Sequence, residues 1–350
     1  MNMPDVLRDI LTLAVHAPSG DNSQPWKFKI DGASITLFNV PEGDQTLYNH
    51  RQRGSYVSHG AVIENICIAA AQMGLISEVF LFPNERDATA RIVFTQGIIK
   101  EQPLLSSITK RVTNRKPYTK KIISHFDINQ LKDEATYGGF ELRVVEEREE
   151  LERLADTLSL NERLLMEHKE LHDFLFGMIR WTEKEELQKP GLHVRTMEFP
   201  APVRFQLRYI LKYWPAVQAL NRIGFSKAIA KQSAGLYKTS SAFGAIIIKD
   251  NSDASYIEGG RALQRVWLKA TSLGLSMQPT TALPYLAGRV EAGETKSLSN
   301  EHIDSITRAY EHITEAFSLE GTEKIALLFR LGYGKEPSAQ SLKLPPVIIH

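Results

Sequence analysis

The chain contains two matching stretches, SYVSHGAVIENICIAAAQMGL (55–75) and SYIEGGRALQRVWLKATSLGL (255–275), which align without a gap when the sequence is shifted by 200 residues. Six of the 21 aligned positions are identical, including the Ser-Tyr start and the Gly-Leu end. Two similar buried helices could match by chance, but the shared start and end favour duplication. A duplicated chain predicts two lobes about a pseudo-twofold axis, a contact where ligand sites often form.

Hydrophobic spacing predicts further elements on both sides of these stretches. In the first half we expect a helix at 5–16, a hairpin of strands 28–30 and 35–38 around Asp31-Gly32, a helix at 60–74, and strands at 79–82 and 90–95. In the second half we expect a charged, helix-breaking patch at 110–121 and an irregular stretch at 185–240. We expect helices at 127–136, 148–182, 256–274 and 301–317. Strands are expected at 141–145, 245–249 and 325–331.

Composition excludes several classes of protein. The 350 residues are 43% hydrophobic and 24% charged, which is ordinary for a globular protein of about two domains. The net charge of +1 gives no global signal for nucleic acid or a membrane surface. No apolar run approaches the ~18 residues of a membrane span, and the N-terminus lacks a signal peptide, so we expect a cytoplasmic location. The chain has a single cysteine, Cys67, which excludes disulfides within the chain and Cys-rich zinc sites. We expect Cys67 to be a small residue of the core.

The segment APSGDNSQPW (17–26) follows the first predicted helix and is rich in turn formers and polar donors. Pro18 and Pro25 stiffen it, Trp26 can anchor it in the core, and Ser19 and Asn22 can offer hydrogen bonds to a polar heterocycle edge. An ordinary turn between a helix and a strand explains the composition equally well.

The segment RVTNRKPY (111–118) places two arginines and a hydroxyl at alternate positions. In extended backbone Arg111, Thr113 and Arg115 point the same way, which suits a phosphate group. A solvated basic loop is the alternative.

Together these two segments resemble the P-S-x-x-N-x-Q-P-W and R-x-S/T-x-R/K motifs of the flavin-dependent nitroreductase family. The resemblance implies that Arg111, Thr113 and Arg115 hold the phosphate of FMN, and that the isoalloxazine ring is bordered by Pro18, Ser19, Gly20 and Asn22. The stretch from Gly274 to Thr281 resembles the family's G-L-x-x-x-P segment, so that Gln278, Pro279 and Thr280 would face the flavin. Lys343 resembles the C-terminal basic position of the family, which implies a further contact with the phosphate. Arg330 is expected to form a structural ion pair or another phosphate contact.

The order of the motifs differs from that of a standard subunit, because each half keeps only one part of the binding site. The pattern is similar to a fused, double-lobed branch of the family known from mycobacteria, the Acg type. The resemblance implies an α+β fold of tandem nitroreductase-like lobes forming an intrachain pseudo-dimer, with mixed antiparallel sheets flanked by helices. We expect an N-terminal lobe at 1–102, a C-terminal lobe at 103–350 with a helical insertion or lid at about 160–240, and one FMN per chain. The fused unit would be a monomer with pseudo-twofold symmetry or a loose homodimer.

The insertion combines aromatic residues with several Arg and Lys side chains. A basic amphipathic stretch can touch a membrane or an acidic partner, but it is more often a solvated helix face, so we expect no membrane and no nucleic-acid partner. His168 and His172 lie four residues apart without a third ligand, so we expect no metal. The sequence has no P-loop, no Rossmann motif and no G-x-S-x-G elbow.

The resemblance implies an FMN-dependent oxidoreductase in which NAD(P)H supplies a hydride and a nitroaromatic, quinone or similar small-molecule acceptor takes two electrons. The flavin carries the chemistry, so we name no catalytic side chain. The alternative is a non-catalytic FMN-binding protein, for storage or sequestration, with a lid over the flavin. A third possibility is a pair of lobes that has lost the flavin.

Overall fold

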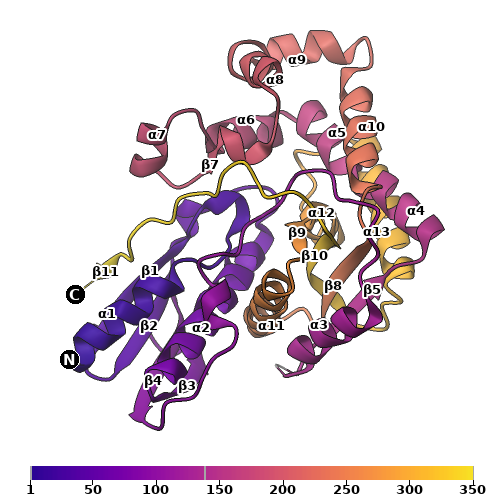
Figure 1. Cartoon of the computed structure of the whole chain (residues 1–350). Helices are drawn as coiled ribbons and strands as arrows, with labels where there is room; N and C mark the ends of the chain where they lie inside the picture. The colour runs from indigo at the N-terminus through magenta and orange to yellow at the C-terminus, as the bar shows by residue number, and fades with distance from the viewer. Residues whose placement is uncertain (1, 138, 350) are drawn as a thin grey trace.

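The computed structural model describes residues 2–137 and 139–349 and has two main sheets flanked by helices (Figure 1). The first half of the chain contributes α1 (Met3–Ala14), β1 (Trp26–Asp31), β2 (Ser34–Asn39), α2 (Arg53–Gln72), β3 (Leu75–Leu81) and β4 (Ala88–Gln96). The second half repeats this order with α3 (His125–Tyr137), β5 (Glu141–Val145), β8 (Ala242–Ile248), α11 (Asp253–Ser272), β9 (Ser276–Pro279) and β10 (Lys324–Gly332). The predicted α+β architecture is confirmed.

The two sheets also share their strand order. One runs β1-β2-β4-β3 and the other β5-β8-β10-β9, and every neighbouring pair in these runs is antiparallel. The first hairpin turns at Gly32, whose φ of +54° suits a residue without a Cβ. Gly74 and Gly274, with φ of +76° and +70°, follow α2 and α11 and let the chain turn into the next strand.

Helices α2 and α11 pack against each other between the sheets, and the contact is reciprocal. A Cβ on Gly60 would lie 1.9 Å from the carbonyl oxygen of Ile257, and a Cβ on Gly260 would lie 2.0 Å from that of Val57. These four positions are pairs under the 200-residue shift. Glycine is therefore needed at both crossing points, because any side chain would force the two backbones apart.

The C-terminal segment runs from the second half back to the first. After β10 it crosses the molecule and ends in β11 (Ile348–Ile349), which pairs parallel with β1 as the fifth strand of that sheet (Figure 1). The last residues of the chain are thus part of the sheet formed by the first hundred.

The second half contains additional helices and short strands. Between β5 and β8 lie α4 (Arg148–Leu158), α5 (Leu160–Glu167), α6 (Lys169–Met178), β6 (Ile179–Arg180), α7 (Glu183–Gln188), β7 (Leu192–His193), α8 (Ala201–Gln206), the π-helical η6 (Leu207–Leu211), α9 (Trp214–Asn221) and α10 (Phe225–Tyr237). Between β9 and β10 lie α12 (Ala282–Glu291) and α13 (Asn300–Ala316).

Two sequence-based predictions fail in this region. The helix expected at 148–182 is three helices, with a first boundary at Ser159. The second boundary lies at His168, which adopts an extended conformation and whose ring accepts a hydrogen bond from the Leu171 amide, starting a new helix. The stretch at 185–240, expected to be irregular, is largely helical. Its prolines did not prevent this, because Pro202 and Pro215 lie in the first turns of α8 and α9, where a missing N–H costs nothing.

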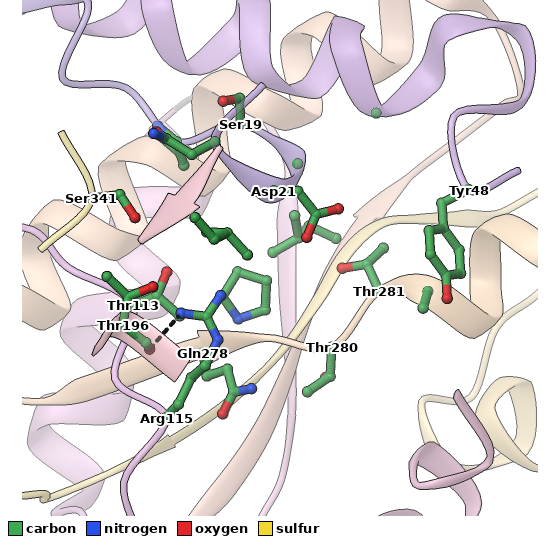
Figure 2. A pocket seen from close by; sticks show the side chains of 18 of the residues that line it. Ser19, Asp21, Tyr48, Thr113, Arg115, Thr196, Gln278, Thr280, Thr281 and Ser341 are labelled. Atoms are coloured by element: carbon green, nitrogen blue, oxygen red, sulfur yellow. Dashed lines mark hydrogen bonds between the residues drawn. The ribbon is translucent and has the colours of Figure 1, made fainter. Parts of the chain in front are cut away.

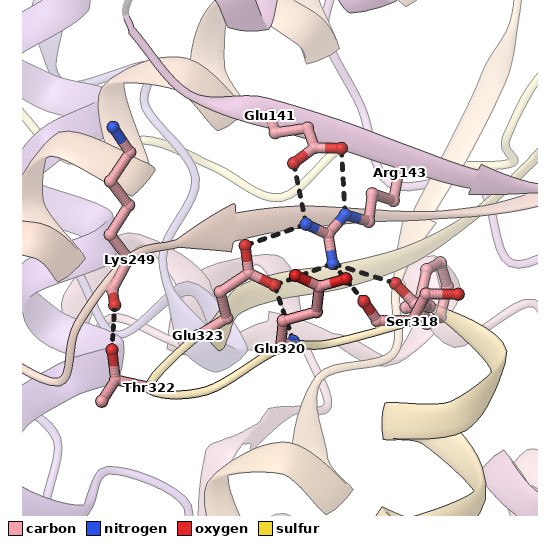
Figure 3. Close-up of polar contacts among 8 residues, drawn as sticks. Glu141, Arg143, Lys249, Ser318, Glu320, Thr322 and Glu323 are labelled. Atoms are coloured by element: carbon pink, nitrogen blue, oxygen red, sulfur yellow. Dashed lines mark hydrogen bonds and ion pairs between the residues drawn. The ribbon is translucent and has the colours of Figure 1, made fainter.

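Arg143 on β5 fixes the edge of the second sheet (Figure 3). Its guanidinium forms paired hydrogen bonds with Glu141 (2.9 Å each) and with Glu323 (2.8 and 2.9 Å), and it also donates to the Ser318 carbonyl at 2.7 Å. These bonds hold the turn before β10 against β5, far from the residues described next.

Candidate functional site

A cavity of about 330 Å³ lies where the two halves meet. Such a volume is at the lower end of the range for small-molecule sites. The cavity is lined by the loop after α1, the start of α2, the segment before α3, β9, the C-terminal segment and the insertion. All eleven residues predicted from sequence line it: Pro18, Ser19, Gly20, Asn22, Arg111, Thr113, Arg115, Gln278, Pro279, Thr280 and Lys343.

The loop after α1 has an unusual backbone. Asp21, Asn22 and Gln24 adopt positive φ values of 46°, 58° and 49°, which non-glycine residues rarely take. The Ser19 hydroxyl accepts a hydrogen bond from the Gln24 amide (3.0 Å), and Trp26 is buried at the start of β1. The predicted anchoring by Trp26 is therefore present, and the loop holds a strained conformation of the kind found at ligand sites.

Asn22 differs from its expected role. Its amide donates to the carbonyls of Gly191 and Leu342 (3.0 Å each), and its oxygen accepts from the Lys343 ammonium at 2.8 Å. Both amide hydrogens are used within the protein, so Asn22 ties the loop to the insertion and the C-terminal segment and has no N–H left for a ligand.

The buried cation Arg111 and the half-buried cation Lys343 lie on the same wall of the cavity. Nη2 of Arg111 donates to the His16 carbonyl (2.9 Å), and the guanidinium lies 4.4 Å from the centre of the Trp267 ring. Burial lowers the pKa of Arg111 to about 10. Burial and the charge of Arg111 lower the pKa of the Lys343 ammonium well below its usual value. Among the described residues, the buried Nε of Arg111 has no hydrogen-bond partner.

Arg115 reaches into the middle of the cavity and donates to the Thr196 carbonyl at 3.2 Å (Figure 2). Asp21 points into the same space from the opposite loop. Burial raises the pKa of the Asp21 carboxyl, and the charge of Arg115 opposes this rise. Asp21 was not among the predicted residues, although it lies inside the quoted segment.

The segment with Arg111 and Arg115 is held beside β9. Thr113 forms a parallel bridge with Met277, and the Asn114 amide donates to the Met277 carbonyl at 2.9 Å. This contact brings Thr113 next to Gln278 and Pro279 across more than 160 residues of sequence.

Gln278 is oriented by Arg330. Nε of Arg330 donates to Oε1 of Gln278 at 2.8 Å, and its other nitrogens donate to backbone carbonyls. Arg330 is fully buried, has no carboxylate partner in the described chain and does not line the cavity. It is therefore neither the ion pair nor the phosphate contact that the sequence suggested. The buried hydroxyl of Thr280, by contrast, lines the cavity without a partner among the described groups.

Sequence reasoning missed a second polar cluster on the cavity wall, formed by Tyr48, Asn161, Glu162 and Tyr237. The Tyr237 hydroxyl donates to Oε1 of Glu162 and the Tyr48 hydroxyl to Oδ1 of Asn161, both at 2.7 Å. Burial raises the pKa of Glu162 to about 7. In the sequence Glu162 is one of many charged residues in a helical stretch, and no spacing signal marks it.

The insertion closes one side of the cavity with the apolar side chains of Leu165, Phe174, Leu175 and Leu192, next to Leu158 at the end of α4. It is tied to the site by hydrogen bonds from Asn22 to Gly191 and from Arg115 to Thr196. Glu186 on α7 also accepts from the Leu342 amide at 2.8 Å. The predicted histidine pair lies elsewhere, and both rings are bonded to backbone carbonyls, of Ser297 and Leu211.

No protein-family model matches the sequence. The "Uncharacterized protein MT1398" of Mycobacterium tuberculosis is 25% identical over 335 residues, which are 94% of this chain and 46% of that protein. Two further proteins of the same organism are each 30% identical. "Putative NAD(P)H nitroreductase acg" matches over 51% of this chain and 54% of its own length, and "Putative NAD(P)H nitroreductase Rv3131" over 40% and 42%.

The chain is therefore similar to proteins named as putative NAD(P)H nitroreductases, to Acg over about half of its length. It spans about half the length of the curated relatives that it matches. Solved structures with partial similarity include a nitroreductase with bound FMN from Bacteroides fragilis (14% identity, 69% of this chain and 94% of that chain, TM-score 0.36). Another is the FMN-dependent nitroreductase NfnB from Mycobacterium smegmatis in complex with NADPH (13% identity, 65% and 85%, TM-score 0.37). TM-scores this low do not establish a shared fold. No helix in the described ranges is long and apolar enough to cross a bilayer.

Proposed function

We propose that the chain binds one FMN in this cavity and acts as an NAD(P)H-linked oxidoreductase on a nitroaromatic, quinone or similar small acceptor. The observation that carries the proposal is that eleven residues, predicted from four separate segments, line one cavity between the halves. The relatives' printed names support the same class of activity.

The donor groups of the cavity fit a ligand with a phosphate at one end. Arg111 is buried and Lys343, which is half-buried, lies near enough to feel its charge. An unbalanced buried charge is costly unless an anion compensates it. The unpartnered Nε of Arg111 is available for a charge-assisted hydrogen bond. Thr113 and Arg115 complete the proposed phosphate site. Sequence resemblance and cavity chemistry therefore favour the same four residues.

The remaining wall fits a flat heterocycle. Pro18, Ser19 and Gly20 border the cavity on one side, and Gln278, Pro279 and Thr280 on the other. The unpartnered Thr280 hydroxyl can donate to a ring acceptor, and Arg330 holds the Gln278 amide in a fixed orientation. FMN, when bound, supplies the hydride chemistry, and the protein contributes placement, hydrogen bonds and exclusion of water.

The acceptor would lie against the insertion. Its leucine and phenylalanine side chains suit an apolar aromatic ring. Glu162 is the adjoining carboxyl that retains a proton near neutral pH, because burial raises its pKa to about 7. Two-electron reduction of a quinone or nitro group consumes protons, and Glu162 is placed to hold one.

The second candidate function is FMN storage or sequestration without turnover. The hydrogen bonds that Asn22 and Arg115 donate to carbonyls of the insertion favour it, because they hold the insertion against the residues proposed to surround the flavin. A nicotinamide ring must reach the flavin for catalysis, so this contact decides between the two functions.

Mixing the purified FMN-loaded protein with NADPH, and separately with NADH, under anaerobic conditions tests the proposal. We expect the flavin absorption band to bleach and to return when 1,4-benzoquinone is added. A loaded protein whose band stays unchanged with both nucleotides, yet bleaches with dithionite, would support sequestration instead. A colourless protein that does not bind added FMN would overturn both.

A further inference from the structure

A cationic arm extends from the insertion. We define it as residues 201–231, comprising α8, η6, α9 and the first part of α10. In Figure 1, α8 and α9 lie at the top of the molecule, away from both sheets. The arm contains six Lys or Arg residues and no Asp or Glu. Because the whole chain carries +1, the remaining residues sum to −5, so positive charge is concentrated on the arm.

Large apolar side chains are exposed on the same arm. Phe205, Tyr209 and Tyr213 follow one another at intervals of four and are 61%, 54% and 54% exposed. Ile223, at the turn between α9 and α10, is 82% exposed. The Phe205 and Tyr209 rings lie 4.8 Å apart, so they share one face, as side chains four apart on a helix do.

These aromatic side chains are not needed for the packing of the arm itself. The opposite face has its own small core, in which Leu207 and Leu211 pack with Met166 and Val217. The exposed stripe therefore has no structural role within the described chain that would explain its apolar character.

The cations accompany the aromatic stripe. Arg204, Arg208 and Lys212 each precede one of the three aromatic residues. Arg208 lies 5.6 Å from the centre of the Tyr209 ring and Lys212 lies 5.3 Å from that of Tyr213. Within the described ranges, none of the six cations of the arm forms an ion pair with a carboxylate. Their charge is thus available to an external anion.

We propose that the cationic arm docks the protein on an anionic lipid surface. Aromatic rings with polar edges favour the boundary between headgroups and acyl chains, and unpaired Arg and Lys side chains favour anionic headgroups. A polyanion such as nucleic acid would use the charges but would leave Phe205 and Ile223 in water, so the combination fits lipid better. The sequence-based expectation is a solvated helix face without a membrane partner; the exposure of the aromatic side chains, which the sequence did not reveal, is what favours lipid instead.

Co-sedimentation of the full-length, FMN-loaded protein with large vesicles tests the proposal. The probes are pure phosphatidylcholine vesicles and vesicles with about one third phosphatidylglycerol. We expect binding to the anionic vesicles alone, and weaker binding as salt is raised. Each basic residue near such a surface changes partitioning about fivefold, so R204Q/R208Q/K212Q is expected to lower it about 100-fold. F205S/Y209S/Y213S is also expected to lower it, because the apolar contribution is lost.

Matched variants elsewhere control for charge and hydrophobicity. K100Q/K120Q/K132Q removes three exposed lysines outside the arm, and I98S/I99S/I122S removes three exposed isoleucines. Both are expected to bind vesicles like the unchanged protein, and circular dichroism checks that every variant folds. Absence of binding to anionic vesicles at low salt would overturn the proposal. Equal losses of vesicle binding in the arm variants and the control variants would also overturn it. So would a protein that binds a short DNA duplex but not vesicles, or one that uses the arm to form a dimer and does not bind vesicles.

Discussion

At the scale of single residues, the buried Arg111 and the half-buried Lys343 decide what the cavity can hold. They lie close together, burial lowers the pKa of both, and Nε of Arg111 has no partner among the described residues. A site of this kind is most stable with an anion between the charges.

Removing the arginines tests this. R111A/R115A is expected to weaken FMN binding by about 3–6 kcal/mol, because each charge-assisted bond contributes about 1.5–3 kcal/mol. Titration of the apo-protein with FMN, followed by quenching of flavin fluorescence, measures the change. R143A, which removes an arginine at the far edge of the second sheet, serves as the control and should bind FMN normally. Unchanged affinity in the double variant would refute the phosphate site.

Glu162 gives a prediction about pH. Burial raises its pKa to about 7 in the folded chain, above the usual 4.5. Its stabilising contribution is therefore full below about pH 4.5 and is lost as the pH rises through about 7. E162Q should be more stable than the unchanged protein at pH 8, by up to about 3 kcal/mol, and the difference should shrink towards pH 5. Urea unfolding of both proteins at the two pH values measures it, and a difference that is the same at both would contradict the assignment.

A motif that places several side chains at fixed spacing is enough to predict that they lie together, although their role in binding FMN stays a prediction. Arg111, Thr113 and Arg115 share one segment, and the segment enters the cavity as a unit. Prediction failed where a role depends on a distant partner. The Asn22 amide is occupied by Gly191, 169 residues away, and Gln278 is oriented by Arg330 from the next strand.

At the scale of elements, the contact between α2 and α11 fixes how the halves meet. Its closest approach is at Gly60 and Gly260, where the backbone of one helix touches that of the other. The cavity borders both helices, through Val57 and Ser58 on one and Leu263 and Trp267 on the other.

G60A is therefore expected to destabilise the protein by about 1–3 kcal/mol or more, because the new Cβ would overlap the Ile257 carbonyl. G260A should do the same, and the double variant should cost less than the sum, since the first substitution already separates the helices. Thermal unfolding measures these effects. G235A in α10 is the matched control: no described atom lies within 4 Å of its new Cβ, so alanine should be neutral or slightly stabilising. A G60A protein as stable as G235A would contradict the packing account.

Elements with a clear hydrophobic period were predicted, among them β5 at 141–145 and the helix observed as α13. The short elements were not. β11 is two residues long, and its place beside β1 depends on the path of the whole C-terminal segment. The helices of the insertion were hidden by prolines that lie in first turns.

At the scale of the whole molecule, the repeated order of elements and the reciprocal glycine contact favour our inference that an ancestral dimer became one chain. The two halves are no longer equivalent. Under the 200-residue shift the cavity residue Trp267 corresponds to Cys67, and Glu64 next to it forms ion pairs with Arg261 (3.1 Å) and Arg265 (2.9 Å). The helix turn beside Cys67 thus carries a cluster of ion pairs, whereas the corresponding Trp267 borders the cavity.

This asymmetry predicts a single flavin site. Quantitative release of the cofactor from the loaded protein should give one FMN per chain. Two per chain would mean that the ion pairs around Glu64 do not preclude a second site and that the asymmetry has been misinterpreted.

The most direct test of the central claim, that both halves together enclose one flavin, is the absorption spectrum of the purified protein before and after saturation with FMN and removal of the excess. We predict that the saturated protein shows the absorption bands of an oxidised flavin at one equivalent per chain. In R111A/R115A these bands should be absent. A protein that remains colourless after incubation with FMN, while its circular dichroism shows an intact fold, would contradict the claim.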